Sequence, residues 1–250
     1  MNVIKVGGNE LSDESFLRRL ALAVASFKEQ VVIVHGGGRG IAELQAKLGV
    51  ATVMVDGLRV TDAQSLQIAQ MALSGDANKV IVRALLEAGV QAIGLSGVDG
   101  GLLCCEKKIY GGHDLGYVGQ IVQVNRRILD LMLDNAFIPV ISPISLGTDG
   151  MIYNVNADEA AGAIASALAA RRVWFISNVA AVLDRNNRRI DTLTPSEAFQ
   201  LMEEETIRDG MVPKVRTALE AVAAGVPEVY IANLEGLVVE QGTRFIRSTT

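Results

Sequence analysis

The sequence is poor in the residues that build disulfide and metal frameworks. It has two cysteines, two histidines and five prolines in 250 residues, and aromatic residues make up 4%. Cys104 and Cys105 are adjacent, and neighbouring cysteines rarely pair, so we predict no disulfide framework and a cytoplasmic location. His35 and His113 are too few for a typical histidine-based zinc site, and we predict no metal site made by protein ligands. We interpret His35 as a structural residue that packs beside the glycines after it.

An excess of positive charge is also missing. Lysine and arginine number 23 against 28 aspartates and glutamates, which gives a net charge of −5. This balance argues against a surface that binds nucleic acid non-specifically. No apolar run approaches the roughly 18–20 residues of a membrane span, and the first residues lack the pattern of a secretory signal. We therefore expect a small-molecule substrate, and neither nucleic acid nor a membrane as a partner.

Half of the residues are apolar, and short apolar runs alternate with helical patterns. This alternation predicts an α/β fold, a three-layer α/β/α sandwich with a mostly parallel central sheet. Glycine-containing stretches at 54–60 and 102–122 are expected to form hairpins added to that sheet. A helix from 61 is expected to end near 74–75, before another helix over 77–88. The predicted buried strands are Asn2–Val6, Val31–Val34, Ala92–Leu95, Phe137–Ile141, Val173–Ile176 and Glu228–Ile231.

Two glycine-rich segments follow predicted strands. Gly7 and Gly8 come after the first strand, and Gly36 and Gly37 come after the second. Glycines at strand-to-helix turns let backbone amides approach a ligand, and amides near a helix N-terminus form an anion site. Each segment alone is more simply a tight turn, but two of them at one edge of a parallel sheet favour phosphate binding. Neither segment matches the phosphate-loop or the dinucleotide-binding pattern.

Three charged residues accompany these segments. Lys5 lies in an otherwise apolar strand, so it is either an edge-strand or snorkelling lysine or, as we favour, a phosphate ligand. Lys214 stands near the start of a predicted helix, where it opposes the helix dipole unless an anion is bound there; an ordinary surface lysine is the alternative. Asp158 follows Asn156 at another helix start. It is either a first-turn acid beside an N-cap or a carboxylate that holds two lysines in place.

A series of short motifs resembles the acetylglutamate kinase branch of the amino-acid kinase family. The resemblance runs nearly end to end, and the order and spacing of the motifs carry it rather than any single one. The motifs are Lys5-Val6-Gly7-Gly8, Val34-His35-Gly36-Gly37-Gly38, Gly57-Leu58-Arg59-Val60-Thr61, Asn78-Lys79, Gly94-Leu95-Ser96-Gly97-Val98-Asp99-Gly100, Asp114-Leu115-Gly116-Tyr117-Val118-Gly119, Asn154–Asp158 and Gly210–Lys214.

The resemblance implies ATP-dependent phosphorylation of the side-chain carboxylate of N-acetyl-L-glutamate, a step of arginine biosynthesis. Its expected cofactors are ATP and Mg²⁺, with the ion held mainly through the nucleotide phosphates. It also implies an N-terminal lobe, 1–155, for the amino-acid substrate and dimerisation, and a C-terminal lobe, 156–250, for ATP, on one continuous sheet. The chemistry is consistent with the residues, because a carboxylate is already ionised at pH 7 and requires no general base.

The same resemblance implies roles for individual residues. Lys5 and Lys214 would stabilise the transferring phosphoryl group, and Asp158 would organise both lysines. Arg59 would bind the α-carboxylate of the substrate. The residues implied to bind the amino acid are Gly36, Gly37, Arg59 and Asn154, and those implied to bind phosphate or nucleotide are Gly7, Gly8, Ser177, Asn178, Leu183, Thr206, Ile207 and Arg208.

Two departures from the family pattern leave alternatives open. The segment 177–182 lacks the Asp followed by Gly that the family usually carries, and its Ser-Asn-Val start is similar to kinases that phosphorylate aminoadipate on a carrier protein. Such a kinase is one alternative, and a degenerate member that senses a nucleotide or metabolite is another. Only four residues precede Lys5. We therefore expect a homodimer that arginine does not inhibit, with the 62–74 helix supplying the dimer contact.

Overall fold

The computed structural model describes residues 1–8, 10–55 and 58–247, and the side chains of residues 54, 55, 58 and 59 lie outside that description. The helices are α1 (Glu14–Ser26), α2 (Gly38–Lys47), α3 (Ala63–Gln70), η1 (Met71–Ala77), α4 (Asn78–Glu87), η2 (Asp99–Gly101), α5 (Arg127–Asp134), α6 (Ala157–Ala167), α7 (Pro195–Glu203), α8 (Met211–Ala223) and α9 (Leu234–Val238). The strands are β1 (Asn2–Val6), β2 (Val31–His35), β3 (Val53–Val55), β4 (Leu58–Val60), β5 (Ala92–Ser96), β6 (Leu103–Tyr110), β7 (His113–Val124), β8 (Ile138–Ser142), β9 (Ile144–Gly147), β10 (Ile152–Asn154), β11 (Arg172–Ile176), β12 (Thr192–Leu193), β13 (Glu228–Ala232) and β14 (Thr243–Phe245).

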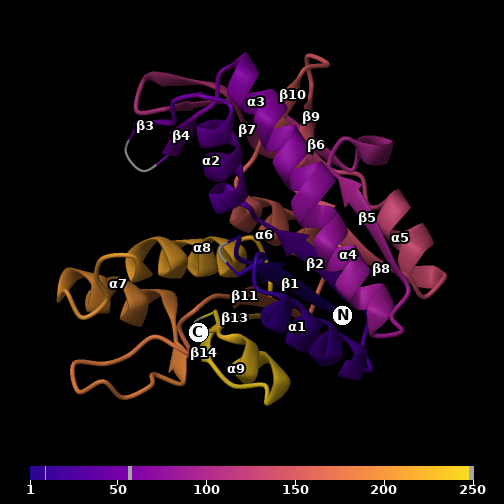
Figure 1. The fold of residues 1–250 in the computed structure, drawn as a ribbon. Coiled ribbons are helices and arrows are strands. Elements are labelled where there is room, and N and C mark those ends of the chain that lie inside the picture. Colours follow the sequence, from indigo (N-terminus) through magenta and orange to yellow (C-terminus); the bar gives the residue numbers. More distant parts are fainter. Residues whose placement is uncertain (9, 56–57, 248–250) are drawn as a thin grey trace.

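An eight-stranded sheet forms the centre of the molecule, and helices cover both of its faces (Figure 1). Its strand order is β12-β14-β13-β11-β1-β2-β8-β5. Within the described part of this sheet, β13 and β14 pair antiparallel and the other neighbours pair parallel. The predicted α/β sandwich with a mostly parallel sheet is therefore confirmed, and all six predicted buried strands belong to it.

Strand β1 lies in the middle of this sheet, between β11 and β2, and its side chains alternate between two cores. Val3 belongs to the core shared with α6 and α8, whereas Ile4 and Val6 belong to the core shared with α1, α4 and α9. Lys5 is two residues from Val3, so its side chain leaves the sheet on the α6 side. The edge-strand interpretation of Lys5 is therefore wrong.

The two glycine-containing hairpins do not extend the main sheet, contrary to the prediction. β6 and β7 form a small closed barrel with β9 and β10, and β3 and β4 form a separate two-stranded ribbon. The barrel has its own interior, where Cys105, Tyr153 and Val155 pack together. These apolar side chains bury one another instead of lining the edge of the main sheet, a difference that alternating apolar residues alone do not reveal.

The predicted helix end at Ser74-Gly75 is also wrong. Helix α3 continues through the π-helical segment η1 directly into α4. Gly75 lies inside η1, and a glycine inside a helix costs only about 1 kcal/mol relative to alanine, which tertiary packing outweighs here. π-helical turns are rare. This one runs beside the loop after β2, where Leu73 packs directly against Gly37.

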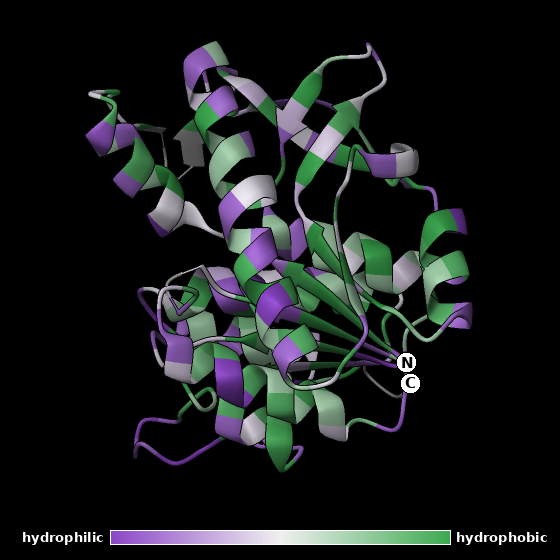
Figure 2. Cartoon of the chain, turned by 45° about the vertical axis from the view of Figure 1, so that its right-hand side comes forward, coloured by the Kyte–Doolittle hydropathy of each residue, from purple (hydrophilic) through white to green (hydrophobic). Residues whose placement is uncertain are grey.

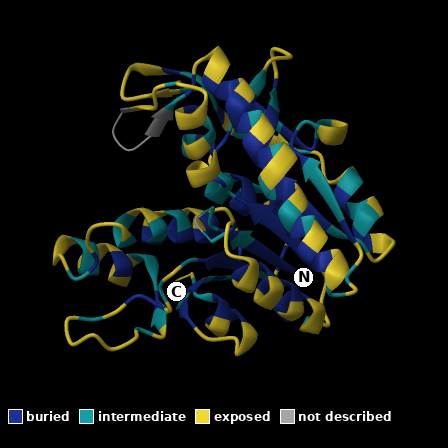
Figure 3. Cartoon of the chain, viewed as in Figure 1, coloured by how far each residue is buried: buried dark blue, intermediate teal, exposed yellow. Residues whose placement is uncertain are grey.

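The strands of the main sheet lie between two large cores, which they share with the helices on both faces. They are largely hydrophobic in Figure 2 and largely buried in Figure 3. A few polar side chains are buried among them, and His35 and Asn78 are both inaccessible to solvent. Across the part of the chain that the structure describes, none of the helices has the length and apolar content needed to cross a lipid bilayer.

Candidate active site

The two glycine loops meet at the carboxyl edge of the main sheet. Because β1 and β2 are parallel and in register, the loops after them leave the same edge. Gly8 and Gly37 are in contact, since a methyl group added to Gly8 would lie 2.5 Å from the Cα of Gly37. A methyl group on Gly36 would lie 3.8 Å from the Cβ of Ala157, the first residue of α6. Both predicted phosphate-binding loops therefore converge on the start of α6.

An ion pair occupies this point of convergence. The Nζ of Lys5 lies 2.7 Å from Oδ1 of Asp158. The Lys5 side chain is 16% exposed and that of Asp158 is 30% exposed, so the pair is shielded but still reachable from solvent. Asn156 caps α6 by accepting a hydrogen bond from the Asp158 N–H at 2.7 Å, which fixes the first turn that presents the carboxylate. The partner that a largely buried ammonium needs is thus supplied by Asp158.

Lys214 is not in contact with this pair. Its Nζ donates a hydrogen bond to the carbonyl oxygen of Gly210 at 3.4 Å, and no ion pair joins it to Asp158 among the described residues. Helices α6 and α8 are in contact, and a methyl group on Gly162 would lie 3.8 Å from the Cβ of Ala221. Asp158 is four residues before Gly162 in α6, and Lys214 is seven residues before Ala221 in α8. Both residues therefore lie in the N-terminal turns of two neighbouring helices.

Two of the residues predicted for the amino-acid substrate, Asn154 and Arg59, lie in strands outside the main sheet. Asn154 is the last residue of β10, two positions before the cap of α6. Arg59 belongs to β4, and its side chain lies outside the described part of the chain. The backbone of Thr61, just after β4, bonds to that of Leu115 and Tyr117 at 2.9 and 2.7 Å, so the ribbon is joined to the barrel. Asn154 thus stands three residues before Ala157, which lies against Gly36, while the roles of Asn154 and Arg59 stay predictions.

A cavity of about 420 Å³ brings together two segments that were predicted to bind nucleotide. Residues 179–183 line it together with residues 206–208, and most of the lining is apolar, as a planar base requires. Ser177 and Asn178 are outside this lining, and the Ser177 hydroxyl accepts a hydrogen bond from the Val179 N–H at 3.3 Å. The predicted residues in the lining are Leu183, Thr206, Ile207 and Arg208.

His35 is fully buried at the end of β2, directly before the second glycine loop. Its Nδ1 lies 2.9 Å from the carbonyl oxygen of Gly36, and its Nε2 lies 3.1 Å from Nδ2 of Asn78. Burial disfavours the charged imidazolium and lowers the pKa of His35 to about 4, and the positive charge of Lys79 acts in the same direction. The position agrees with a structural role for His35.

Sequence reasoning gave no role to Asn78. A signal was present, because Asn78 shares the buried face of α4 with Ile81 and Leu85, at helical spacings of three and seven. A polar residue on such a face needs hydrogen-bond partners, and the structure supplies them from three strands. Asn78 was therefore named only within a family motif, and its contacts beside the glycine loop were not predicted.

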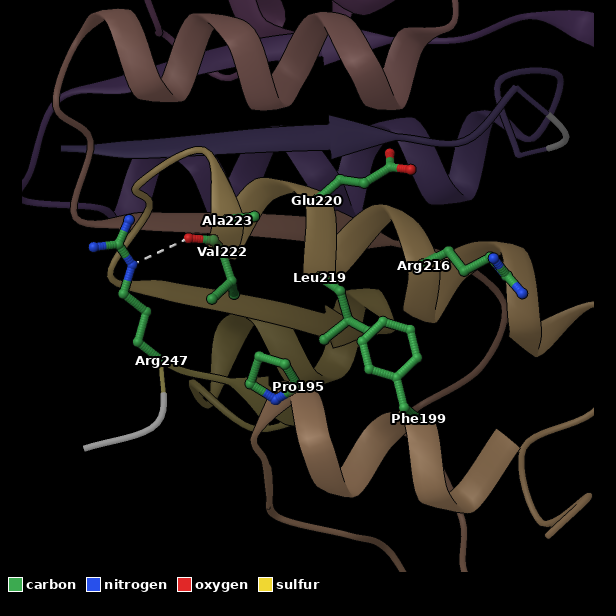
Figure 4. Close-up of a pocket in the computed structure, with 8 residues that line it drawn as sticks. All are labelled: Pro195, Phe199, Arg216, Leu219, Glu220, Val222, Ala223 and Arg247. Carbon is green, nitrogen blue, oxygen red and sulfur yellow. Dashed lines mark hydrogen bonds between the residues drawn. The ribbon is translucent and has the colours of Figure 1, made fainter. Parts of the chain in front are cut away.

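A second cavity, of about 360 Å³, lies between α7 and α8 (Figure 4). Its walls are mainly apolar, with Pro195 and Phe199 from α7 facing Leu219 and Val222 from α8. None of the residues that line it is among the predicted site residues. We therefore place it outside the candidate active site. Within the described residues, no group of three or more His, Cys, Asp and Glu side chains is arranged to hold a metal ion.

Comparison with known proteins identifies the family of the chain. The sequence profile of the amino acid kinase family matches residues 1–233. The chain belongs to the amino acid kinase family. Membership implies an enzyme that transfers a phosphoryl group from ATP, and it accounts for the paired glycine loops at the carboxyl edge.

Within this family, the chain is similar to curated acetylglutamate kinases over nearly its whole length. It is 49% identical over 244 residues to the acetylglutamate kinase of Roseiflexus castenholzii, covering 98% of this chain and 93% of that protein. It is 42% identical over 250 residues to the acetylglutamate kinase of Methanopyrus kandleri, covering 97% and 99%. Among solved structures, smu.665 from Streptococcus mutans UA159 matches with a TM-score of 0.82 and 31% identity over 98% of both chains.

Proposed function

We propose that this chain is an acetylglutamate kinase, which phosphorylates the side-chain carboxylate of N-acetyl-L-glutamate with ATP in arginine biosynthesis. The structural observation that supports it is the Lys5–Asp158 ion pair at the meeting point of two glycine loops. The choice of substrate is supported by the relatives, which are named acetylglutamate kinases at 42–49% identity. They do not favour the aminoadipate kinase or the degenerate sensor as alternatives.

In the proposed reaction, a carboxylate oxygen of the substrate attacks the γ-phosphorus of ATP. The bond from that phosphorus to the β–γ bridging oxygen breaks, ADP leaves, and an acyl phosphate forms. Because the nucleophile is already an anion at pH 7, catalysis consists of positioning and of neutralising charge on the γ-phosphoryl oxygens. The ammonium groups of Lys5 and Lys214 and the amides of the glycine loops provide that positive potential.

The remaining site assignments are part of the same proposal. Gly7 and Gly8 bind phosphate, while Gly36 and Gly37 bind the amino acid together with Arg59 and Asn154. The cavity between 179–183 and 206–208 takes the adenine, and residues 1–155 and 156–250 act as the amino-acid and ATP lobes. Mg²⁺, when bound with ATP, is held through phosphates and water and neutralises phosphate charge. Homodimeric assembly and a cytoplasmic location complete the proposal, the latter supported by the free thiols of Cys104 and Cys105.

Trapping the product as a hydroxamate tests this function directly. Hydroxylamine displaces phosphate from an acyl phosphate, so the purified protein with ATP and Mg²⁺ should form hydroxamate from N-acetylglutamate. Glutamate, aspartate and N-acetyl-aminoadipate should each give much less. Lys5→Met serves as the matched inactive control. Equal or greater turnover of N-acetyl-aminoadipate would assign the chain to the alternative kinase, and ADP release without hydroxamate would exclude carboxylate phosphorylation.

A further inference from the structure

The side-chain amide of Asn78 connects three strands of the main sheet behind the glycine loop that follows β2. Its Nδ2 donates a hydrogen bond to the carbonyl oxygen of Val140 in β8 at 2.9 Å. The same nitrogen lies 3.3 Å from the carbonyl oxygen of Leu95 in β5 and 3.1 Å from Nε2 of His35 in β2. Asn78 and His35 are both inaccessible to solvent, so no water competes for these bonds.

Lys79 holds the oxygen end of this amide, in agreement with the carbonyl oxygens of Val140 and Leu95 that accept at its nitrogen end. Its Nζ donates to Oδ1 of Asn78 at 2.9 Å. An ammonium can only donate, so the atom facing Lys79 is the amide oxygen, and the NH₂ group is directed to the three strands. Space is limited on the same side, because a methyl group added to Gly94 would overlap Oδ1 of Asn78. Lys79 and the missing side chain of Gly94 thus both act at the oxygen end of the amide, and the carbonyl oxygens of Val140 and Leu95 face its nitrogen end.

The orientation of Asn78 in turn fixes the tautomer of His35. The Gly36 carbonyl can only accept, so Nδ1 of His35 carries the proton. Nε2 is then a bare acceptor, and it faces the NH₂ group of Asn78. Both imidazole nitrogens therefore form hydrogen bonds: Nδ1 donates to the Gly36 carbonyl oxygen, and Nε2 accepts from the NH₂ group of Asn78.

Helical segment η1 packs directly against the glycine loop that follows β2. Leu73 of η1 packs so closely on Gly37 that the glycine has no room for a side chain. Gly37 lies against Leu73 and Ala77 of η1, and Gly36 lies against Gly8 and the start of α6. The π-helical segment and the start of α4 form the support for the loop.

We infer that Asn78 is a positioning residue for substrate binding, which acts through neutral, Nδ1-protonated His35 to hold the Gly36-Gly37 backbone in place. The inference rests on the proposed function for its kinetic consequence, because that loop binds the amino acid. Asn78 touches no substrate in this arrangement. Its effect is transmitted through His35 and the Gly36 carbonyl.

Gly94→Ala is the sharpest kinetic test, since its methyl group displaces the Asn78 amide and removes no hydrogen-bonding group. We expect KM for N-acetylglutamate to rise about tenfold and KM for ATP to stay within about twofold. Gly40→Ala in α2 is the matched control, because no atom lies within 4 Å of the added methyl group. A folded Gly94→Ala variant with unchanged KM for N-acetylglutamate would overturn the inference.

Lys79→Met provides a second route, because Lys79 is exposed and its loss leaves the core intact. It should raise KM for N-acetylglutamate in the same direction as Gly94→Ala, and Lys79→Arg should restore it by keeping a donor. If Gly94→Ala does not fold, this pair decides the question. An unchanged KM in Lys79→Met, or the same rise in Lys79→Arg, would contradict a role in orienting Asn78.

The histidine tautomer can be read without any activity. The chain has two histidines, so a long-range ¹H–¹⁵N spectrum contains two imidazole systems, and a His113→Gln variant identifies that of His35. We expect His35 to show a protonated Nδ1 and a bare Nε2, and Gly94→Ala to alter this signature. A protonated Nε2 in the wild type would refute the inference. Failure of the wild type to phosphorylate N-acetylglutamate would instead refute the proposed function and leave the spectrum as an independent test.

Discussion

The ammonium of Lys5 and the carboxylate of Asp158 are 2.7 Å apart, although one residue lies in the first strand and the other begins a helix after residue 156. Lys5 leaves the central strand on the α6 side, and Asn156 caps α6 so that its first turn faces the lysine. The topology of the sheet therefore places Lys5, and the Asn156 cap of α6 places Asp158. A lysine held in this way is oriented before substrate arrives.

Removing the charge of Asp158 should slow the chemical step. We expect Asp158→Asn to lower kcat about a hundredfold with smaller changes in either KM, because Lys5 loses the partner that orients it. Steady-state kinetics by the hydroxamate assay measures this. Asp130→Asn is a matched control, since Asp130 pairs with Arg126 on α5, outside the proposed site. Equal kcat for Asp158→Asn and wild type would contradict the orienting role.

Lys214 should act on developing charge although it does not touch Asp158. Lys214→Met is expected to lower kcat by about a hundredfold or more, because a cation that contacts the transferring phosphoryl group acts mainly in the transition state. Lys47→Met, at an exposed position in α2, serves as the control. A normal kcat in Lys214→Met would make Lys214 the ordinary surface lysine that the sequence also allowed.

Arg59 is expected to act on binding rather than on rate. Loss of its guanidinium in Arg59→Ala removes a charge-assisted contact to the α-carboxylate, which should raise KM for N-acetylglutamate about tenfold or more. KM for ATP should change little, and initial rates with each substrate varied in turn separate the two effects. A selective loss of ATP affinity would show that the two lobes exchange their proposed roles.

Stability should depend on pH through His35. Burial lowers its pKa from 6.5 to about 4, so the unfolded chain takes up a proton near pH 6.5 that the folded chain resists. The free energy of unfolding should therefore decrease as the pH falls from 7 to 5, by about 2 kcal/mol from this group. Urea unfolding at several pH values measures it. The slope should be smaller in His35→Gln and retained in His113→Gln; a slope unaffected by His35→Gln would contradict the buried neutral state.

Much of the main sheet and part of the site could be predicted from the sequence. The six predicted strands are short apolar runs, and glycines directly follow β1 and β2. These signals are local, so the strands were predicted correctly. Lys5 was singled out because a charge in an apolar strand needs a partner. Asp158 was singled out because it follows Asn156 at a helix start, where it was either a first-turn acid or a partner for two lysines. Both inferences depend on composition within a few residues.

The errors involve interactions between distant segments. Gly75 resembles a helix stop, but packing of η1 against the loop at Gly37 keeps the helix continuous. Apolar and polar residues alternate in the hairpin of β6 and β7, as in an edge strand of a sheet. These strands nevertheless pair with β9 and β10 in a separate small barrel. The hydrogen bonds of Asn78 could not be predicted, because they depend on where Val140 and Leu95 lie, and both residues belong to strands distant in the sequence. No pattern within one segment contains that information.

The central place of β1 has a consequence for synthesis on the ribosome. Residue 2 pairs with residue 31 on one side and with residue 172 on the other, so the second neighbour of the strand is made much later than the strand itself. Contacts between segments so far apart in sequence form slowly. Until β11 is made, the backbone N–H and C=O groups on that edge of β1 have no strand partner. We therefore expect products that stop before β11 to aggregate, because one edge of β1 then stays unpaired.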